Sequence, residues 1–386
     1  MDLNSELIKI RRTIHQYPEL GCKEYRTSEF IRKVLDRYNI CNKSVNKTGV
    51  VGILKGKLGH NNETEQHCIA LRADIDALPV DEQNNKPYKS KYRNIMHACG
   101  HDANTTIVLG AAILLSRISE QFNGTVKFIF QPNEESADGA QGMIKSGVLK
   151  KPDVTAIVGI HVNSQLSTGI VGIKYGEMMS AVDKFEVDVF GGGGHAAYPH
   201  QGKDTILCVT EIINSIHTIV SRKIDPVEPV VISITTINGG TRFNILAEKV
   251  NFTGTVRTLN ERMHKFIPKI MFRTINDITK RHNLKFNFKY DILGYPLINV
   301  RSILDICVSA AKKVSKIKIL DKPSMGGEDF AEYLRYVPGC FIYIGSRKDN
   351  NTGYPWHHPK FDIDETVLLK GAEVLKEIVL EYLKFN

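Results

Sequence analysis

The sequence predicts an α/β protein in which a smaller α/β module is inserted into a larger domain. Helix and strand patterns alternate along residues 1–178, as they do in domains built around an open α/β sheet. Residues 179–291 then follow a β-α-β-β-α-β order, which is that of a ferredoxin-like unit. The first kind of alternation resumes over residues 292–386. We therefore expect one discontinuous domain, 1–178 plus 292–386, that carries an inserted module at 179–291.

Helices of the larger domain are predicted where apolar residues recur three and four positions apart, and strands where β-branched residues cluster. The first helix ends at Pro18, and Pro79 stops the second strand, because proline cannot donate a backbone hydrogen bond. The predicted helices are 4–18, 27–38, 105–115, 138–147, 302–313, 330–336 and 365–382, and the predicted strands are 50–54, 68–76, 126–130, 156–160 and 340–344.

The inserted module is predicted from the same two periodicities. Its first strand alternates apolar and polar residues, and Gly239-Gly240 marks the turn between its two middle strands. The contiguous glycines 191–194 lack the Lys-Ser/Thr of a phosphate-binding loop, so we interpret them as a sharp turn before His195. The predicted strands are 182–190, 229–238, 247–259 and 284–290, and the predicted helices are 205–220 and 261–282.

The composition excludes several classes of protein. The net charge is +9, but the lysines and arginines are spread thinly along the chain, and 42 acidic residues lie among them. This distribution argues against a nucleic-acid partner. No apolar run approaches the roughly 20 residues of a membrane span, and the chain does not begin like a signal peptide. Seven scattered cysteines, an odd number, do not suggest a disulfide framework. We expect a cytoplasmic protein that binds neither nucleic acid nor membranes.

Polar side chains follow three of the predicted strands where each strand ends. Asp74 and Asp76 close the second strand, Glu134-Glu135 follows the third, and His161 follows the fourth. Functional groups in open α/β sheets gather at the carboxyl ends of the strands. We therefore expect these side chains to lie near one another.

The stretch from Met96 to Asp102 brings a thiol and an imidazole two residues apart, with Gly100 between them. Cys99 and His101 can point the same way from an extended or tightly turned backbone. This arrangement is compatible with half of a metal site, with a thiol–imidazole pair for nucleophilic catalysis, or with a plain loop.

The adjacent glutamates favour the metal interpretation. We expect them on an extended backbone, where neighbouring side chains diverge, so that one carboxylate can bind a metal while the other acts as a general base. Taken singly, Glu134-Glu135 is compatible with solvated acids, and His161 or His357 with a structural histidine. Taken together they supply ligands for two ions. A catalytic Cys99 would leave these four residues without a role, so the metal interpretation is preferred and the thiol remains the alternative.

The order of the motifs resembles that of one enzyme family over nearly the whole chain. It is similar to the dinuclear metal-dependent amidohydrolases that include hippurate hydrolase, auxin-conjugate hydrolases and N-acetyldiaminopimelate deacetylase, within the aminoacylase–carboxypeptidase superfamily. The resemblance implies a mixed-sheet metallohydrolase catalytic domain with a ferredoxin-like lid domain. The motifs are Met96-His97-Ala98-Cys99-Gly100-His101-Asp102, Gln131-Pro132-Asn133-Glu134-Glu135, Gly159-Ile160-His161, Gly193-Gly194-His195, Phe243-Asn244-Ile245 and Gly327-Glu328-Asp329-Phe330.

The resemblance also implies roles for individual residues. Glu134 would be the general base, and Asp76 would support a metal ligand. The lid residues His195, Asn244 and Arg257 would bind the substrate. Two divalent ions, zinc or manganese with nickel or cobalt as further options, would be held by Cys99, His101, Glu135, His161 and His357, with Cys99 shared between them.

Two positions depart from the family pattern. Relatives usually have alanine where Asn133 stands and often histidine where Asn104 stands. Neither position is a ligand, so we expect an effect on the detail of the pocket and not on activity.

The implied reaction is hydrolysis of the amide bond of an N-acyl amino acid, such as an N-acetyl or N-benzoyl derivative. Alternatives are a dipeptidase or carboxypeptidase of the same superfamily, an N-acetyldiaminopimelate deacetylase of lysine biosynthesis, or a metal- or amino-acid-binding protein without turnover. Relatives associate through the lid, so a homodimer or homotetramer formed through that domain is expected.

Overall fold

The computed structural model describes residues 2–58 and 67–385, which divide into two units. Unit 1 extends to Gly176 and resumes with Ile298–Lys322 and with the C-terminal segment from Asp329. Unit 2 comprises Glu177–Leu297 and Pro323–Glu328. The sequence places the inner boundaries after residues 178 and 291, and no pattern in it indicates that Pro323–Glu328 belongs to unit 2.

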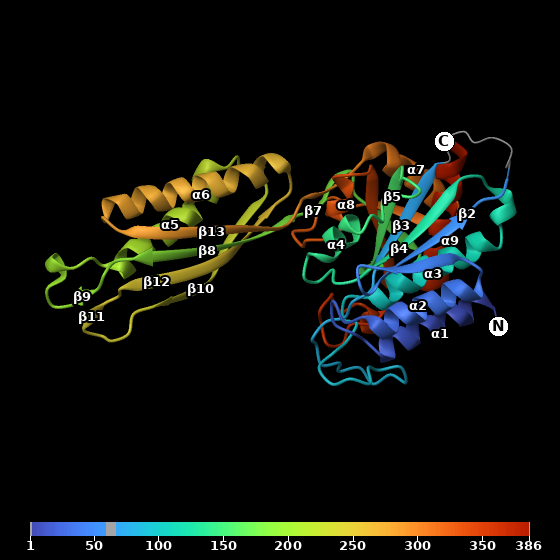
Figure 1. Ribbon diagram of the computed structural model, residues 1–386, viewed down its shortest axis with the longest axis horizontal. Helices are drawn as coiled ribbons and strands as arrows, with labels where there is room; N and C mark the ends of the chain where they lie inside the picture. The colour runs from blue at the N-terminus through green and yellow to red at the C-terminus, as the bar shows by residue number, and fades with distance from the viewer. Residues whose placement is uncertain (1, 59–66, 386) are drawn as a thin grey trace. The chain divides into compact units, whose positions relative to one another are not determined.

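Unit 1 is built on a mixed eight-stranded sheet with the order β1-β2-β4-β3-β5-β16-β6-β15 (Figure 1). The four central strands β4, β3, β5 and β16 run parallel, whereas β1 and β2 continue the sheet antiparallel at one edge. The predicted α/β class with a mixed sheet is confirmed. The strands are β1 (Cys41–Val45), β2 (Gly49–Lys55), β3 (Cys68–Asp74), β4 (Thr125–Gln131), β5 (Ala156–Ser167), β6 (Ile170–Ile173), β15 (Lys316–Ile319) and β16 (Gly339–Arg347).

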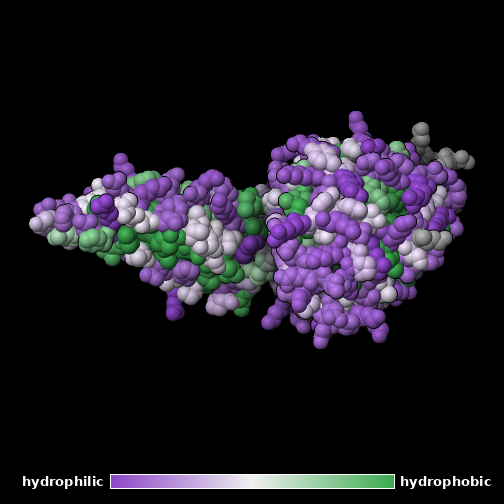
Figure 2. All heavy atoms as spheres, turned by 90° about the horizontal axis from the view of Figure 1, so that it is seen from below, coloured by the Kyte–Doolittle hydropathy of each residue, from purple (hydrophilic) through white to green (hydrophobic). Residues whose placement is uncertain are grey.

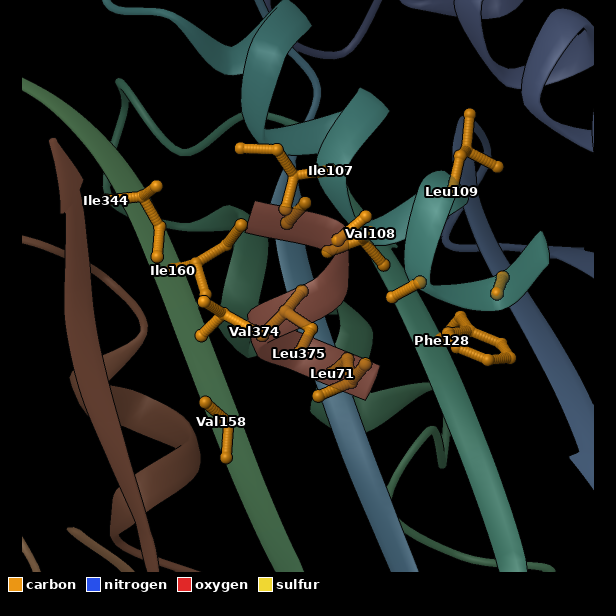
Figure 3. Close-up of a cluster of buried hydrophobic side chains, with 14 of the residues drawn as sticks. Leu71, Ile107, Val108, Leu109, Phe128, Val158, Ile160, Ile344, Val374 and Leu375 are labelled. Atoms are coloured by element: carbon orange, nitrogen blue, oxygen red, sulfur yellow. The ribbon is translucent and has the colours of Figure 1, made fainter. Parts of the chain in front are cut away.

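Helices α3 and α9 supply much of the core of unit 1 (Figure 3). Ile107 of α3 and Val374 of α9 pack over side chains of the central strands, among them Leu71 and Val158. Almost every residue of α3 is buried, which fits a helix that is apolar on most sides and contacts both α1 and α9. The helices are α1 (Leu3–Gln16), α2 (Tyr25–Arg37), α3 (His101–Ser116), α4 (Gly139–Lys145), α7 (Arg301–Ala311), α8 (Ala331–Leu334) and α9 (Val367–Phe385).

Two elements next to the candidate site differ from the prediction. β5 continues to Ser167, so His161 lies inside the strand and not after it, and it pairs with Tyr343 of β16. α3 begins at His101, four residues before its predicted start. The polar residues of its first turn, such as Asp102, interrupt the apolar periodicity that marks the rest of the helix.

Short strands account for the remaining differences. Segments of three to five residues hold too little alternation to be predicted. The strands concerned are β1, β6, β15 and the pair formed by β7 (Gly176–Met179) and β14 (Leu297–Asn299).

Unit 2 contains a four-stranded antiparallel sheet with the order β10-β12-β8-β13, and its elements follow the predicted β-α-β-β-α-β order (Figure 1). Phe185 and Val187 of β8 join a core cluster with apolar residues of both helices. The elements are β8 (Ala181–Phe190), α5 (Thr205–Lys223), β10 (Val230–Gly239), β12 (Lys249–Thr258), α6 (Glu261–Arg281) and β13 (Lys285–Gly294), with a short pair of β9 (Gly194–His195) and β11 (Ile245–Leu246). Among the helices of the described ranges, none is both long and apolar enough to span a membrane.

Replacing Leu375 with alanine should lower the free energy of unfolding of unit 1 by about 2–5 kcal/mol. Leu375 is fully buried on α9, so its truncation removes apolar contacts and leaves a cavity. Urea unfolding followed by circular dichroism measures the change. The matched control is Leu58→Ala at a position that is 54% exposed, where we expect a change within about 0.5 kcal/mol. Equal losses in the two variants would contradict this placement of the core.

Candidate metal centre

The five predicted ligands lie together in unit 1 and form two groups that share one residue. Cys99, His101 and His161 each offer a ligand atom within 4.8 Å of the others. Cys99, Glu135 and His357 form the second group by the same measure. Cys99 Sγ lies 3.6 Å from His161 Nε2, and His357 Nε2 lies 3.5 Å from Glu135 Oε1. The side chains therefore outline two neighbouring candidate metal positions with the Cys99 sulfur common to both.

A tight turn orients the first two ligands. Gly100, between Cys99 and His101, has a φ of +91°, which glycine adopts without strain. A Cβ atom at Gly100 would lie 2.4 Å from the side chain of Val162, so a larger residue does not fit there. After this turn, His101 is the first residue of α3.

Asp76 holds two of the ligands. Its Oδ1 and its backbone oxygen lie 3.1 and 2.9 Å from His101 Nδ1, and its Oδ2 accepts a hydrogen bond of 3.1 Å from the backbone N–H of Glu135. Because a carbonyl oxygen and a carboxylate both accept, Nδ1 of His101 carries a proton. This arrangement suits a neutral imidazole whose Nε2 lone pair binds a metal. The contacts fit the supporting role expected for Asp76.

The imidazole of His161 is neutral at neutral pH. Burial lowers the pKa of His161 to about 4, although Asp74 acts in the opposite direction. Nδ1 of His161 lies 2.8 Å from the carbonyl oxygen of Val162 and must donate to it. The Nε2 lone pair therefore faces Cys99, as a metal ligand requires.

The thiol of Cys99 is poorly suited to act as a nucleophile by itself. Burial raises the pKa of the Cys99 thiol well above its usual value, and the neighbouring Glu134 and Glu135 raise it further, while His101 opposes them. A cysteine nucleophile needs a lowered pKa. The alternative of thiol catalysis is therefore not supported, whereas a cation bound at this position would stabilise the thiolate.

Two ligand atoms face each other without a hydrogen-bond partner among the described residues. They are His101 Nε2 and Glu135 Oε1, both buried and 3.9 Å apart. Buried polar atoms without a partner are rare because they are costly, and a bound cation would satisfy both. One thiolate, three imidazoles and a carboxylate also form a donor set that suits divalent transition metals. The residues therefore fit the pair of ions that the sequence predicts.

Glu134 lies beside these ligands. With His101 and Glu135 it forms a third group whose ligand atoms lie within 4.8 Å of one another, and its Oε2 is 4.0 Å from His101 Nε2. The two glutamates lie in a turn after β4 and not on the extended backbone that we expected. Asn133 enters this turn with a φ of +57°, a conformation that asparagine adopts more readily than alanine.

Asp74 is a neighbour of the ligands to which the sequence assigns no role. Its Oδ2 lies 3.8 Å from His101 Nε2, yet Arg72 Nη1 and Asn104 Nδ2 donate to its two oxygens at 2.9 and 2.8 Å. Asn104 Oδ1 in turn accepts from the backbone N–H of Val162 at 2.9 Å. Asn104 thus ties the end of β3 to β5, a contact that composition and spacing give no means to foresee.

A buried ion network joins α1 to the start of α3. Arg11 Nε lies 2.7 Å from Asp102 Oδ2, and Arg11 Nη2 lies 2.9 Å from Asp362 Oδ1. His15 Nδ1 lies 2.8 Å from the same oxygen of Asp102, and His15 Nε2 lies 3.3 Å from Glu82. Burial and Arg11 lower the pKa of His15, but Asp102 and Glu82 outweigh them and raise it to about 9.

The three predicted substrate-binding residues belong to unit 2, where they lie at two ends of its sheet. His195 in β9 pairs with Ile245 in β11 and is therefore next to Asn244. Arg257 pairs with Val182 at the start of β8, whereas β9 follows the opposite end of β8. Unit 2 thus brings His195 and Asn244 together and holds Arg257 apart from them.

Comparisons relate this chain to known proteins. Residues 70–381 match the model of peptidase family M20/M25/M40. The chain is 40% identical over 386 residues to an N-acetyl-L-cysteine deacetylase of Bacillus subtilis, covering 100% of this chain and 90% of that protein. It is 37% identical over 300 residues to an N-acyl-L-amino acid amidohydrolase of Geobacillus stearothermophilus, covering 77% and 79%. Among solved structures, a dinuclear metal-binding peptidase of the M20 family from Bacillus subtilis is similar, with a TM-score of 0.87, 34% identity and 99% coverage of both chains.

The charged His15 should make stability depend on pH. Folding raises the pKa of His15 from 6.5 to about 9. The resulting contribution to the free energy of unfolding is fully present below pH 6.5 and is lost as the pH rises through 9. The difference in free energy of unfolding between wild type and His15→Gln should therefore shrink by up to about 3 kcal/mol between pH 6 and pH 10. Urea unfolding of both proteins at each pH measures it. A difference that is constant or grows with pH would contradict a charged His15.

Proposed function

The chain belongs to peptidase family M20/M25/M40, and from this premise we propose how its residues carry out the reaction. The protein is a hydrolase that uses two divalent metal ions to cleave the amide bond of N-acyl amino acids, releasing a carboxylate and a free amino acid. The observation that supports the residue assignment is the pair of ligand groups that share Cys99, with Glu134 beside them.

Glu134 is both general base and general acid in this scheme. When bound, the two metal ions polarise the amide carbonyl and lower the pKa of a water molecule. Glu134 removes a proton from the attacking water and delivers it to the nitrogen of the leaving amine. His195 donates a hydrogen bond to the carbonyl oxygen as negative charge develops on it.

The ligands divide between two ions. His101 and His161 would hold one ion and Glu135 and His357 the other, and the Cys99 thiolate is common to the two ligand groups. Two imidazoles and a thiolate at the first position favour zinc, and the carboxylate at the second also suits manganese. Nickel and cobalt fit the same donors, so metal analysis of the purified protein decides between them.

Arg257 binds the carboxylate of the amino acid. Its side chain is half-buried, and no hydrogen bond or ion pair to it is found among the described residues. Burial lowers the pKa of Arg257, and Asp183 opposes this effect. A guanidinium group stays charged in proteins, and its planar fork matches a carboxylate.

One copy of unit 2 is unsuited to bring His195 and Arg257 to the same substrate. Eight residue steps of β8, from Val182 to Phe190, separate the two places, which is about 26 Å at 3.3 Å per residue. An N-acyl amino acid is much shorter than this. We propose that His195 and Asn244 of one subunit complete the active site of a second subunit in a homodimer, and a homotetramer would contain two such dimers.

The surface of unit 2 offers an interface for this dimer. β10 is an edge strand, and edge strands can pair with a second chain. Figure 2 shows hydrophobic surface along unit 2. The exposed hydrophobic residues of β10 and of α5, which contacts β10, include Ile237, Ile206 and Leu207, each at least 47% exposed. A second copy would bury this surface.

We also propose the class of substrate and the cellular compartment. A panel of substrates separates the alternatives. N-acetyl and N-benzoyl amino acids test for an acyl-amino-acid hydrolase, and N-acetyldiaminopimelate tests for a dedicated deacetylase. Free dipeptides test for a dipeptidase, and peptides from which the C-terminal residue is cleaved test for a carboxypeptidase. Turnover of none of them by metal-replete protein would favour a binding protein. All seven cysteines are free thiols, which fits a reducing cytoplasm.

Glu134→Gln should lower kcat on N-acetyl amino acids by about 10²–10⁴-fold, because the amide cannot take up the proton of the water. Both metal ions should remain, as measured by elemental analysis of the dialysed protein. Glu135→Gln is the contrasting variant, which should lose metal as well as activity. Full activity of Glu134→Gln with its metals in place would refute the scheme.

Mixing two inactive variants should restore activity if subunits share their active sites. His195→Ala and Arg257→Ala are each expected to be inactive, but a heterodimer of the two contains one site with both wild-type residues. After random exchange of subunits, the mixture should reach about a quarter of the wild-type activity. Size-exclusion chromatography with light scattering checks that dimers are present. A mixture no more active than its components would show that each chain acts alone.

A further inference from the structure

Trp356 is the chain's one tryptophan, and it lies against a metal ligand. Its ring centroid is 5.0 Å from that of His161, with the two planes 71° apart. Its Nε1–H donates a hydrogen bond of 3.0 Å to the carbonyl oxygen of Val162. An edge contact of this kind restricts how the imidazole of His161 can tilt.

The carbonyl oxygen of Val162 is also the acceptor for His161 Nδ1, at 2.8 Å. Two side chains that share one acceptor are held in a fixed relation to each other. The backbone N–H of Val162 donates to Asn104 Oδ1, so the peptide groups on both sides of this residue are fixed. The acceptor is therefore not free to follow a movement of either ring.

Trp356 is joined by one peptide bond to His357, the ligand of the other metal position. His357 has a φ of +65°, a conformation that is unfavourable for a residue other than glycine. Its side chain is 56% exposed, so packing contributes little to its placement. Its backbone N–H donates to the carbonyl oxygen of Ala98 at 2.8 Å. That bond and the Trp356 indole are two of the contacts that attach this part of the chain to the ligand-bearing segments, and the Trp356 ring also lies 5.8 Å from that of Tyr343.

We propose that Trp356 is a positioning residue that couples the two metal positions. It fixes the ring of His161 at one position and anchors the backbone that presents His357 at the other. An ion bound by His161 would hold this ring against the indole, and the indole would keep the backbone of His357 in place for the second ion. This inference rests on the proposed function, because it assumes that both positions bind metal.

Zn²⁺ titration of metal-free protein tests the coupling without reference to activity. In Trp356→Phe, which keeps an aromatic ring but lacks the N–H donor, the weaker of the two Zn²⁺ affinities should fall about 10–100-fold, while the tighter should change by less than about threefold. Isothermal titration calorimetry measures both. The matched control is Tyr354→Phe, in the same segment, since Tyr354 stacks on His358 at 4.5 Å. This control should keep both affinities.

The wild-type protein provides a second measurement that needs no variant. Because Trp356 is the only tryptophan, its emission should change as Zn²⁺ binds. The proposal is overturned if calorimetry records two equivalents of Zn²⁺ without a change in emission, or if Trp356→Phe keeps both affinities. Either result leaves the proposed function intact. Binding of no Zn²⁺ by the wild type would overturn the proposed function and this inference together.

Discussion

The arrangement of the candidate metal centre depends on a single carboxylate, that of Asp76. One of its oxygens faces the ring nitrogen of His101, and the other accepts the backbone N–H of Glu135. These two ligands come from segments far apart in the chain, a helix start and a turn after β4. Asp76 follows β3, which lies between two parallel partners in the middle of the sheet. The sheet thus gives the ligands a common rigid support.

Buried charges around the ligands are paired, and this pairing keeps the metal positions specific. Asp74 is near enough to His101 to compete for an ion, but Arg72 and Asn104 occupy both of its oxygens. Asp102, directly after His101, is likewise engaged by Arg11 and His15. Removing either arginine would leave a buried carboxylate without its guanidinium partner, which is unfavourable. The arginines therefore determine which acids remain available as ligands.

The sequence predicts the chemistry of the site better than its geometry. Cys99, His101, Glu135, His161 and His357 could be chosen because their residue types match metal ligands and recur in a known order. Their grouping around a shared sulfur was expected only from the resemblance, because it depends on strand register, which no local pattern contains.

Contacts across the fold explain what the sequence does not predict. β5 runs past His161 because β16 lies beside it, and Asn104 acts through a backbone group 58 residues away. The sequence indicates no contact for Trp356 beyond its place next to His357, since its partner Val162 is 194 residues distant. The periodicity of a sequence depends on residues that are close along the chain, and it contains no information on residues that are close only in space. The candidate ligands, and Asp76 through the resemblance, could be chosen from the sequence, whereas the contacts of Asn104 and Trp356 could not.

The segment Pro323–Glu328 changes how the inserted unit should be regarded. Ser180 in unit 2 donates to the carbonyl oxygen of Met325 at 2.8 Å, and its backbone N–H donates to Gly326 at 3.0 Å. A Cβ atom on Gly327 would lie 2.1 Å from the side chain of Val182. A gene fragment that encodes only residues 177–297 therefore omits a part of the unit. Transplanting this unit between proteins, in the laboratory or by recombination, requires two separate exchanges in one gene.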